Sequence, residues 1–281
     1  MTAPHRVKQA LPGLARALAK ARKTSRAAKV KLWVASDPLV RKFRAAAQGR
    51  QDLVHCPVCD STFRRFAPAG DPVRGQAQCW NCGARERHRL LWRYLQDRTD
   101  LFDSCPKRVL HLAPEQALAR RLGDKVALDY VTGDLCPENP SYAGLNALRV
   151  DVTKMPFDDG SFDVILCNHL LEHVPDDATA MRELFRVLRP GGWAILQVPI
   201  DYANPATIED PSVTDPAQRD LVFGQRDHVR WYGRDYPDRL RAAGFDVTED
   251  DYARNLPPEL LRLERLPRSE LIYFCAKPRQ Q

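Results

Sequence analysis

Four of the eight cysteines form two Cys-x-x-Cys pairs, a spacing typical of a metal site. Cys56 pairs with Cys59 and Cys79 with Cys82, and 19 residues separate the two pairs. Each pair places two thiolates on one side of a tight turn, so together they supply the four soft ligands of a closed tetrahedral zinc site. Zinc held this way stabilises a fold and does no chemistry. Redox or disulfide pairing and free thiols are the alternatives.

The other four cysteines stand singly, and we expect each to be a small hydrophobic core residue. They are Cys105, Cys136, Cys167 and Cys275. Free thiols and a metal site both indicate a reducing compartment.

Three carboxylates follow short apolar runs, where parallel strands would end: Glu115, Asp134 and Asp151. Asp134 comes 19 residues after Glu115, which suits a carboxylate that accepts hydrogen bonds from ribose hydroxyls. Each also has a plainer interpretation. Asp134 could form a simple turn, Asp151 could cap the turn that follows it, and Glu115 could favour the dipole of a helix starting at residue 116.

A second group of polar side chains follows the apolar segment 162–167. It contains Asn168, His169, Glu172 and His173. A near-continuous apolar run is typical of a parallel strand covered on both faces, and open α/β sheets bind ligands at the carboxyl ends of such strands. We therefore expect these side chains to lie at a binding site.

The elements that position these residues alternate between strand and helix. The sequence predicts strands over 148–151, 162–167 and 193–198, and earlier strands ending near residues 112 and 134. One helix is expected over 116–122. Another starts at Asp176 and Asp177, and the segment 189–192, Arg-Pro-Gly-Gly, ends it.

Together these signals resemble the S-adenosylmethionine-dependent methyltransferases of the Rossmann-like class. The matching segments are Asp151–Val152, Met155–Phe157, Phe162–Asp163, Leu171–Val174 and Leu188–Gly192. Five ordered signals are far more specific than any one alone, and the resemblance covers about residues 107–250. It implies an α/β fold with a doubly wound, seven-stranded sheet, here preceded by a small zinc ribbon and a basic helical N-terminal arm.

The resemblance also implies where S-adenosylmethionine binds. The residues that it assigns to the cofactor are His111, Ala113, Glu115, Asp134, Asp151, Val152 and Asn168. Asp151, with the backbone of Val152, would contact adenine. The glycines usual in the first turn are missing, and Ala113 with Pro114 permits fewer conformations, so this turn must differ from the common pattern.

Substrate-specific elements are expected after the fifth strand. Residues 201–220, rich in Pro, Asp and Thr, would form a loop over the site, and the lid would extend to about residue 233. Arg226 and Arg230 could clamp a carboxylate or phosphate. His228 could take a proton from the acceptor, with Tyr232 beside it. The alternative is that His228 and Arg230 pair with acids of the lid as structural contacts.

At the mouth of the fourth strand, His169 is a further catalytic candidate and His173 a substrate contact. In the family that the chain resembles, a Glu-His pair such as Glu172 and His173 often caps the following helix instead. The basic run Arg85–Arg89 leads into a predicted amphipathic helix. It could grip phosphates, or it could be a solvated helix start paired with acidic neighbours.

Composition supports three parts: a basic helical extension over 1–50, a zinc ribbon with connecting helix over 51–97, and a methyltransferase domain over 98–281. The chain has 281 residues, 44% of them hydrophobic and 28% charged, and no apolar run long enough to span a bilayer. Residues 1–50 hold 13 Lys or Arg against one acid, Asp37. This arm could bind RNA, anionic lipid or an acidic partner, could mimic a transit peptide, or could be a solvated helical extension.

The leading hypothesis is a cytoplasmic methyltransferase that uses S-adenosylmethionine. Its acceptor would be a small metabolite or biosynthetic intermediate that can be anionic, and its zinc would be structural. One alternative is an RNA methyltransferase that binds RNA through the ribbon and the basic arm. The other is a non-catalytic binding module with a degenerate cofactor site.

Overall fold

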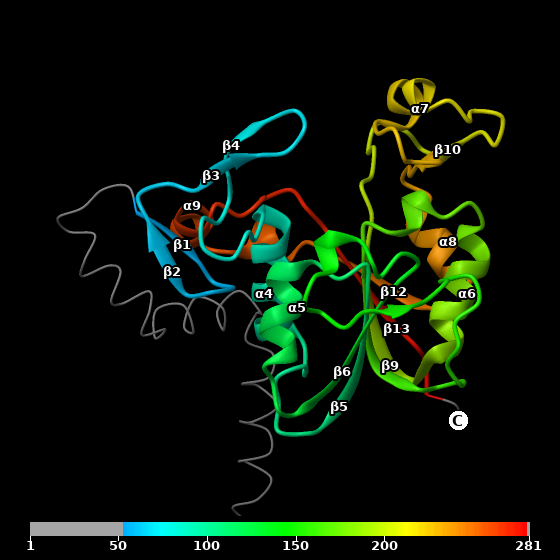
Figure 1. The fold of residues 1–281 in the computed structure, drawn as a ribbon, viewed down its shortest axis with the longest axis horizontal. Helices are drawn as coiled ribbons and strands as arrows, with labels where there is room; N and C mark the ends of the chain where they lie inside the picture. The colour runs from blue at the N-terminus through cyan, green and yellow to red at the C-terminus, as the bar shows by residue number, and fades with distance from the viewer. Residues whose placement is uncertain (1–52, 280–281) are drawn as a thin grey trace, which may run out of the picture.

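A seven-stranded mixed sheet forms the centre of the computed structural model, which describes residues 53–279 (Figure 1). Across the sheet the strands are β12 (Asp246–Asp250), β13 (Ile272–Ala276), β9 (Leu188–Gln197), β8 (Phe162–Asn168), β5 (Lys107–Leu112), β6 (Leu128–Asp134) and β7 (Leu148–Arg149). β13 is antiparallel to both of its neighbours, and the other adjacent pairs are parallel. The predicted doubly wound, seven-stranded α/β sheet is confirmed.

Helices cover both faces of this sheet (Figure 1). They are α4 (Glu86–Arg98) and α5 (Gln116–Gly123) on one face, and α6 (Asp177–Val187) and α8 (Tyr236–Ala242) on the other. Strand β8 carries apolar side chains on both faces of the sheet. Val164 and Leu166 belong to the core cluster under α4 and α5, whereas Ile165 and Cys167 belong to the cluster under α6 and α8. A central strand with apolar side chains on both faces is the pattern expected of a parallel sheet.

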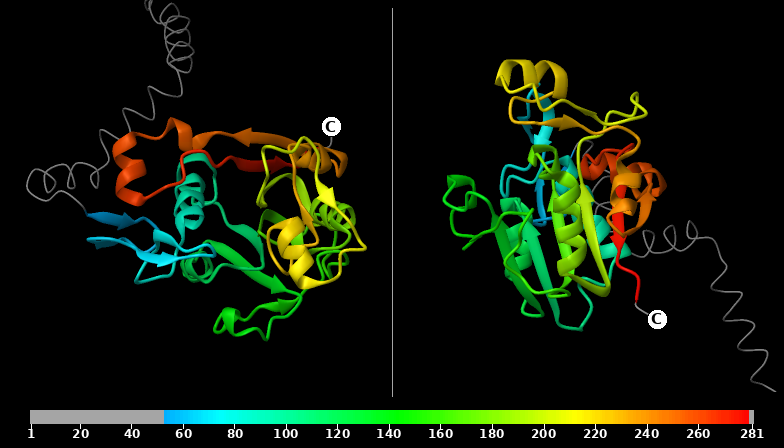
Figure 2. Two further views of the ribbon diagram at one scale, coloured as in Figure 1. Left: turned by 90° about the horizontal axis from the view of Figure 1, so that it is seen from above. Right: turned by 90° about the vertical axis from the view of Figure 1, so that its right-hand side faces the viewer.

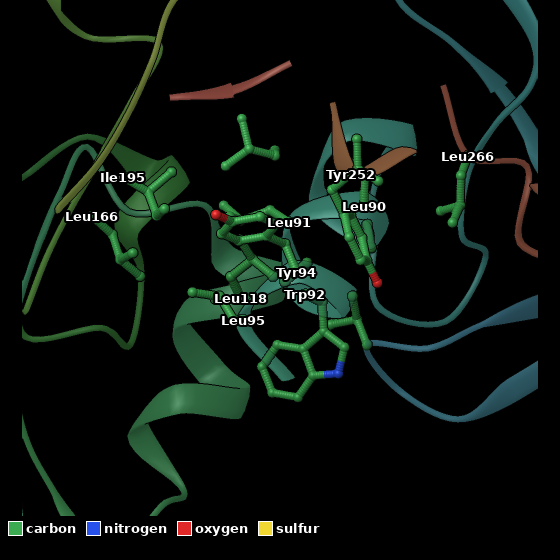
Figure 3. Packing of buried hydrophobic residues seen from close by; sticks show 14 of the residues in the cluster. Leu90, Leu91, Trp92, Tyr94, Leu95, Leu118, Leu166, Ile195, Tyr252 and Leu266 are labelled. Carbon is green, nitrogen blue, oxygen red and sulfur yellow. The ribbon is translucent and has the colours of Figure 1, made fainter. Parts of the chain in front are cut away.

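Helix α4 is buried along most of its length (Figure 3). Leu91 and Trp92 pack in the core cluster, and Tyr94 meets Tyr252 edge to face at 5.4 Å between ring centroids. The helix is therefore a central part of the core rather than a surface connector.

The small N-terminal module consists of two antiparallel hairpins. One pairs β1 (Val54–Cys56) with β2 (Ser61–Phe63), and the other pairs β3 (Ala67–Ala69) with β4 (Arg74–Gln78). Helix α9 (Pro258–Glu264), from the C-terminal part of the chain, packs on β1.

Two buried arginines of α4 tie this module to the rest of the chain. Arg89 is fully buried and donates hydrogen bonds to the backbone oxygens of Ala77 at 3.0 Å, Ala84 at 2.8 Å and Glu264 at 2.7 Å. Arg93 pairs with the fully buried Glu264 carboxylate, with its Nε 2.9 Å from Oε2. For Arg89, both predicted roles, a phosphate grip and a solvated helix start, are therefore wrong, because backbone carbonyls occupy its donors.

Helix α6 ends at Val187, just before the segment 189–192 that was predicted to end it. The prediction of the following strand was wrong at its start, because β9 begins at Leu188 and not at Trp193. Gly191, at a φ of 78°, bends the chain within this strand. Gly192 is also required, because a Cβ there would lie 2.7 Å from the backbone oxygen of Asp163. The glycines thus bend a continuous strand rather than separate two elements.

The prediction of core positions for the single cysteines holds for half of them. Cys167 and Cys275 are buried, whereas Cys105 and Cys136 are exposed, so the prediction was wrong for those two. Both exposed residues lie outside the helices and strands, where no apolar run surrounds them.

The segment after β9 contains β10 (Ile208–Glu209), α7 (Pro216–Phe223) and β11 (Arg230–Trp231), and β10 pairs with β11. Figure 2 shows it in yellow, on the far side of the molecule from the two hairpins. The short helices are η1 (Pro140–Tyr142), η2 (Leu171–His173) and η3 (Tyr252–Asn255). Within residues 53–279, every helix is too short or too polar to traverse a bilayer. The predicted arm over residues 1–50 lies outside the described residues, and the three-part division stays a prediction.

Candidate functional site

Two strained residues mark the carboxyl ends of neighbouring strands. Ala113 directly follows β5 at a φ of 46°, and His169 directly follows β8 at a φ of 53°. This left-handed conformation favours glycine and costs other residues energy. The first turn therefore reaches the left-handed region without glycine.

Glu115 is held at this edge by a chain of hydrogen bonds. Its Oε2 lies 2.8 Å from His111 Nε2, and His111 Nδ1 lies 2.7 Å from the hydroxyl of Tyr130. Asn168 also donates to the same carboxylate at 3.5 Å. Burial raises the pKa of Glu115, but the His111 hydrogen bond and nearby positive charges outweigh it and lower the pKa to about 2. Glu115 is therefore a fixed anion at the mouth of the sheet.

His88, near the start of α4, faces Glu115 with its Nε2 3.9 Å from Oε1. Its Nδ1 accepts a hydrogen bond from the backbone N–H of Arg85 at 3.2 Å. Burial lowers the pKa of His88 to about 3, so the ring is neutral and carries its proton on Nε2. This N–H is a donor with no hydrogen-bond partner among residues 53–279.

Four buried polar atoms without hydrogen-bond partners gather around this edge. Within the described chain they are Arg87 Nε, His88 Nε2, Asn168 Oδ1 and Glu172 Oε2. The first two are donors and the last two are acceptors. Buried polar atoms are almost always paired in folded proteins, so such a cluster indicates a place for a polar ligand.

A pocket of about 890 Å³ opens beside these atoms, and Arg87, His169, Gln197 and Glu270 line both it and a small cavity of about 10 Å³ next to Glu115. The small cavity has room for about one water, so a larger group would have to move its walls. The wall of the large pocket comes from β4, the start of α4, the end of β9 and residues 258–273.

The large pocket is rich in positive charge. Its arginines are Arg74, Arg87, Arg262, Arg265 and Arg268, and its acids are Glu86 and Glu270. Burial raises the pKa of Glu270. The pocket therefore favours an anion.

The predicted ribose and adenine contacts lie at the ends of β6 and β7. Asp134 accepts hydrogen bonds from the backbone N–H of Cys136 and the hydroxyl of Tyr142, each at 2.8 Å. Asp151 caps the following turn through Thr153, and Val152 is buried. Each carboxylate retains lone pairs for a ligand. Their roles toward a cofactor stay predictions.

Arg230 of the lid segment, predicted to bind a carboxylate or phosphate of the substrate, instead contacts the protein itself. Arg230 is buried and donates to the carbonyls of Leu171 at 3.0 Å and Pro175 at 2.8 Å, to that of Val174, and to the carboxylate of Glu209 at 3.0 Å. These contacts match the structural alternative and do not favour a clamp on substrate.

Tyr232, predicted as a catalytic residue, also has a structural partner. Tyr232 is fully buried and donates to Asp177 at 2.7 Å, while Arg226 is exposed. Of the lid residues in the predicted site, His228 alone lies close to His173, at 4.9 Å between ring centroids.

The four cysteines of the two Cys-x-x-Cys pairs come together. Sγ of Cys56 lies 3.6 Å from that of Cys82, and Sγ of Cys59 lies 3.6 Å from that of Cys79. All four sulfurs lie within 4.8 Å of one another. Disulfide sulfurs would be about 2 Å apart. Zn–S bonds of about 2.3 Å place tetrahedral sulfurs about 3.8 Å apart, so the cluster fits a metal ion.

Sequence reasoning missed Arg87 and His88 as site residues. In the sequence Arg85–Arg89 was interpreted as one basic run, although its members lie on different faces of a helix start. A histidine inside a basic run, directly before an apolar helix, was the signal that could have separated a site residue from solvated charge.

Comparison with known proteins identifies the family. A model of a methyltransferase domain matches residues 112–196. The chain is 32% identical to a demethylmenaquinone methyltransferase of Clavibacter sepedonicus over 196 residues, which cover 62% of this chain and 78% of that protein. It is 34% identical to a demethylmenaquinone methyltransferase of Roseiflexus castenholzii over 151 residues, 51% of this chain and 56% of that protein.

The chain spans only part of several relatives, including 32% of the length of an uncharacterized methyltransferase of a Mycobacterium species. Among solved structures, an S-adenosylmethionine-dependent methyltransferase from Mesorhizobium loti is 18% identical. That alignment covers 66% of this chain and 96% of that one, with a TM-score of 0.44. From the matched relatives and the confirmed sheet, this chain belongs to the S-adenosylmethionine-dependent methyltransferases of the Rossmann-like class.

Proposed function

We propose that this protein transfers a methyl group from S-adenosylmethionine to a small anionic acceptor. The observation that carries the proposal is the set of unpartnered donors and acceptors at the carboxyl edge of the sheet. Their chemistry matches the amino-acid end of the cofactor, which presents one carboxylate and one ammonium group.

The residues at this edge divide into two sets that suit these two groups. Arg87 and His88 offer N–H donors for the carboxylate, and Glu115 with Asn168 Oδ1 offers acceptors for the ammonium. Asp134 would hold the ribose hydroxyls, and Asp151 with the backbone of Val152 would contact adenine. When bound, the cofactor supplies a methyl group on a sulfonium, which is electrophilic without help from the protein.

The large arginine-rich pocket would hold the acceptor. Arg87 and His169 line it, so it adjoins the proposed cofactor position, and Tyr202 and Tyr273 add aromatic surface. The pocket walls would align the nucleophile and exclude water, which are the main demands of an in-line displacement. His169, which lines this pocket, would take a proton where the acceptor begins protonated. Two of the matched relatives are named demethylmenaquinone methyltransferases, and this supports a small-molecule acceptor.

We also propose that the four-cysteine cluster binds zinc with a structural role. Four thiolates close the coordination shell, so no position is open to substrate. The cluster adjoins the start of α4, and zinc would thereby fix the position of Arg87 and His88.

The test is calorimetric titration of the full chain with S-adenosylmethionine and S-adenosylhomocysteine. Glu115→Gln should weaken the binding of both at least about tenfold, because it removes the anion opposite the ammonium. Glu249→Gln, an exposed acid on edge strand β12, is the matched control and should leave both affinities unchanged. Absence of binding by the metal-loaded wild type would instead support the non-catalytic binding module.

A further inference from the structure

A second cluster of potential metal ligands lies outside the four cysteines. Glu172 and His173 belong to η2, and His228 follows α7 in the lid segment. One ligand atom from each of the three residues lies within 4.8 Å of the other two. Residues 55 positions apart in the sequence thus converge on one point.

The two histidines are oriented by backbone carbonyls. His228 Nδ1 lies 3.1 Å from the oxygen of Phe223, and His173 Nδ1 lies 3.2 Å from the oxygen of Asp227. A carbonyl can only accept, so each Nδ1 carries the proton and each Nε2 keeps its lone pair. Metal-binding histidines are typically fixed in this way, with the second ring nitrogen donating to a carbonyl or carboxylate.

One oxygen of the buried glutamate in the cluster lacks a hydrogen-bond partner within the described residues. Glu172 is 1% exposed, and its Oε2 has no hydrogen-bond partner within the described part of the chain. Its Oε1 lies 3.4 Å from His169 Nδ1. Leaving a carboxylate oxygen buried and unpaired is costly, and a bound cation would offset that cost.

We propose that Glu172, His173 and His228 bind a divalent transition-metal ion through two imidazole nitrogens and one carboxylate. Nitrogen ligands favour zinc, cobalt, nickel or iron over magnesium and calcium, which prefer oxygen. Three protein ligands leave further coordination positions open, unlike the closed set of four thiolates. The side chain of His173 is 30% exposed, which gives the ion a route from solvent.

Such an ion would link two parts of the structure. Glu172 and His173 lie just beyond the carboxyl end of β8, and His228 lies on the lid segment, so the ion would fasten the lid to the sheet. His169, which contacts Glu172, also lines the large pocket. The proposed ion therefore stands next to the acceptor pocket without forming part of the ribbon.

Metal content of the purified full chain tests this proposal. After zinc loading and removal of excess metal, wild type should retain two equivalents by elemental analysis, one of them in the four-cysteine cluster. His228→Gln and His173→Gln should each retain one. His88→Gln is the matched histidine control and should retain two, because the contacts of His88 are with Arg85 and Glu115 and not with the three proposed ligands. Circular dichroism checks that each variant is folded. If His228→Gln does not fold because His228 is buried, His173→Gln tests the proposal instead, since His173 is partly exposed.

Cobalt loading distinguishes the two sites by spectroscopy. The four-cysteine site gives a sulfur-to-cobalt charge-transfer band, and the histidine–glutamate site adds ligand-field bands without sulfur character. Those added bands should disappear in His228→Gln and Glu172→Gln while the charge-transfer band remains. One retained equivalent in wild type, or two in folded His173→Gln, would overturn the proposal. Neither outcome depends on methyl transfer, so the proposed function is tested separately.

Discussion

At the scale of single residues, Ala113 carries strain that a glycine would relieve. We expect Ala113→Gly to raise the free energy of unfolding by about 0.5–1 kcal/mol, because glycine adopts a φ of 46° without steric cost. Urea denaturation measures the change. Ala119→Gly, inside helix α5, is the control and should destabilise the protein. A less stable Ala113→Gly protein would show that the left-handed turn is not a strained position.

His88 gives a pH-dependent prediction. Burial lowers the pKa of His88 from 6.5 to about 3, so between pH 6.5 and 5 the unfolded chain gains a proton at this residue and the folded chain does not. The free energy of unfolding therefore falls with falling pH, by on the order of 1–2 kcal/mol from this residue. His88→Gln should remove that share of the acid sensitivity, because glutamine does not titrate. The helix start should be kept, since glutamine can also accept the hydrogen bond from the Arg85 N–H. Zinc-saturated samples, denatured by urea at both pH values, give the comparison. An equal loss of stability in wild type and variant would contradict the assignment.

Single residues also show what the sequence could and could not predict at the site. Glu115, Asp134 and Asn168 stand at strand ends, and their positions follow from strand periodicity. The burial of Arg230 does not, because its partners are backbone carbonyls brought close by η2, and sequence carries no pattern for such contacts. Arginines that bind substrate and arginines that bind carbonyls look alike until the fold is known.

At the scale of elements, helix α4 depends on one buried ion pair. We expect Arg93→Met to cost about 3–5 kcal/mol, because Glu264 would remain buried with its main cation gone. The double variant Arg93→Met with Glu264→Met should recover much of this loss. Arg262→Met, on the exposed surface of α9, should change stability by less than about 0.5 kcal/mol. Chemical denaturation of the four proteins measures these differences. A single variant as stable as wild type would show that the pair does not hold α4 to α9.

Helices and strands were predicted well where their apolar residues follow one clear pattern. β8 and α6 follow from a continuous apolar run and a helical spacing, and both lie close to the predicted bounds. The start of β9 was not predicted, because Pro and Gly are typical of chain breaks and here form an irregularity within the strand, between Leu188 and Trp193, which both pair with β8. The packing of α9 on β1 was also beyond the sequence, since it joins segments about 200 residues apart and has no local signature.

At the scale of the whole molecule, the module of two N-terminal hairpins and the methyltransferase sheet line one pocket. Arg74 and Gln76 of β4 and Arg87 of α4 line the same pocket as residues at the end of β9. Removal of metal from the four-cysteine cluster should therefore lower the melting temperature and weaken S-adenosylhomocysteine binding at least about tenfold. Calorimetry before and after chelation, with zinc restored as the control, measures this. Unchanged cofactor affinity in the metal-free protein would show that the module does not position α4.

We expect the amino-acid end of the cofactor to bind the unpartnered atoms at the carboxyl edge of the sheet. A crystal structure of the full chain with S-adenosylhomocysteine tests it most directly. In that structure the ligand carboxylate should lie against Arg87 and His88, and the ligand ammonium against Glu115 and Asn168. A complex whose amino-acid end contacts none of these four side chains would contradict it.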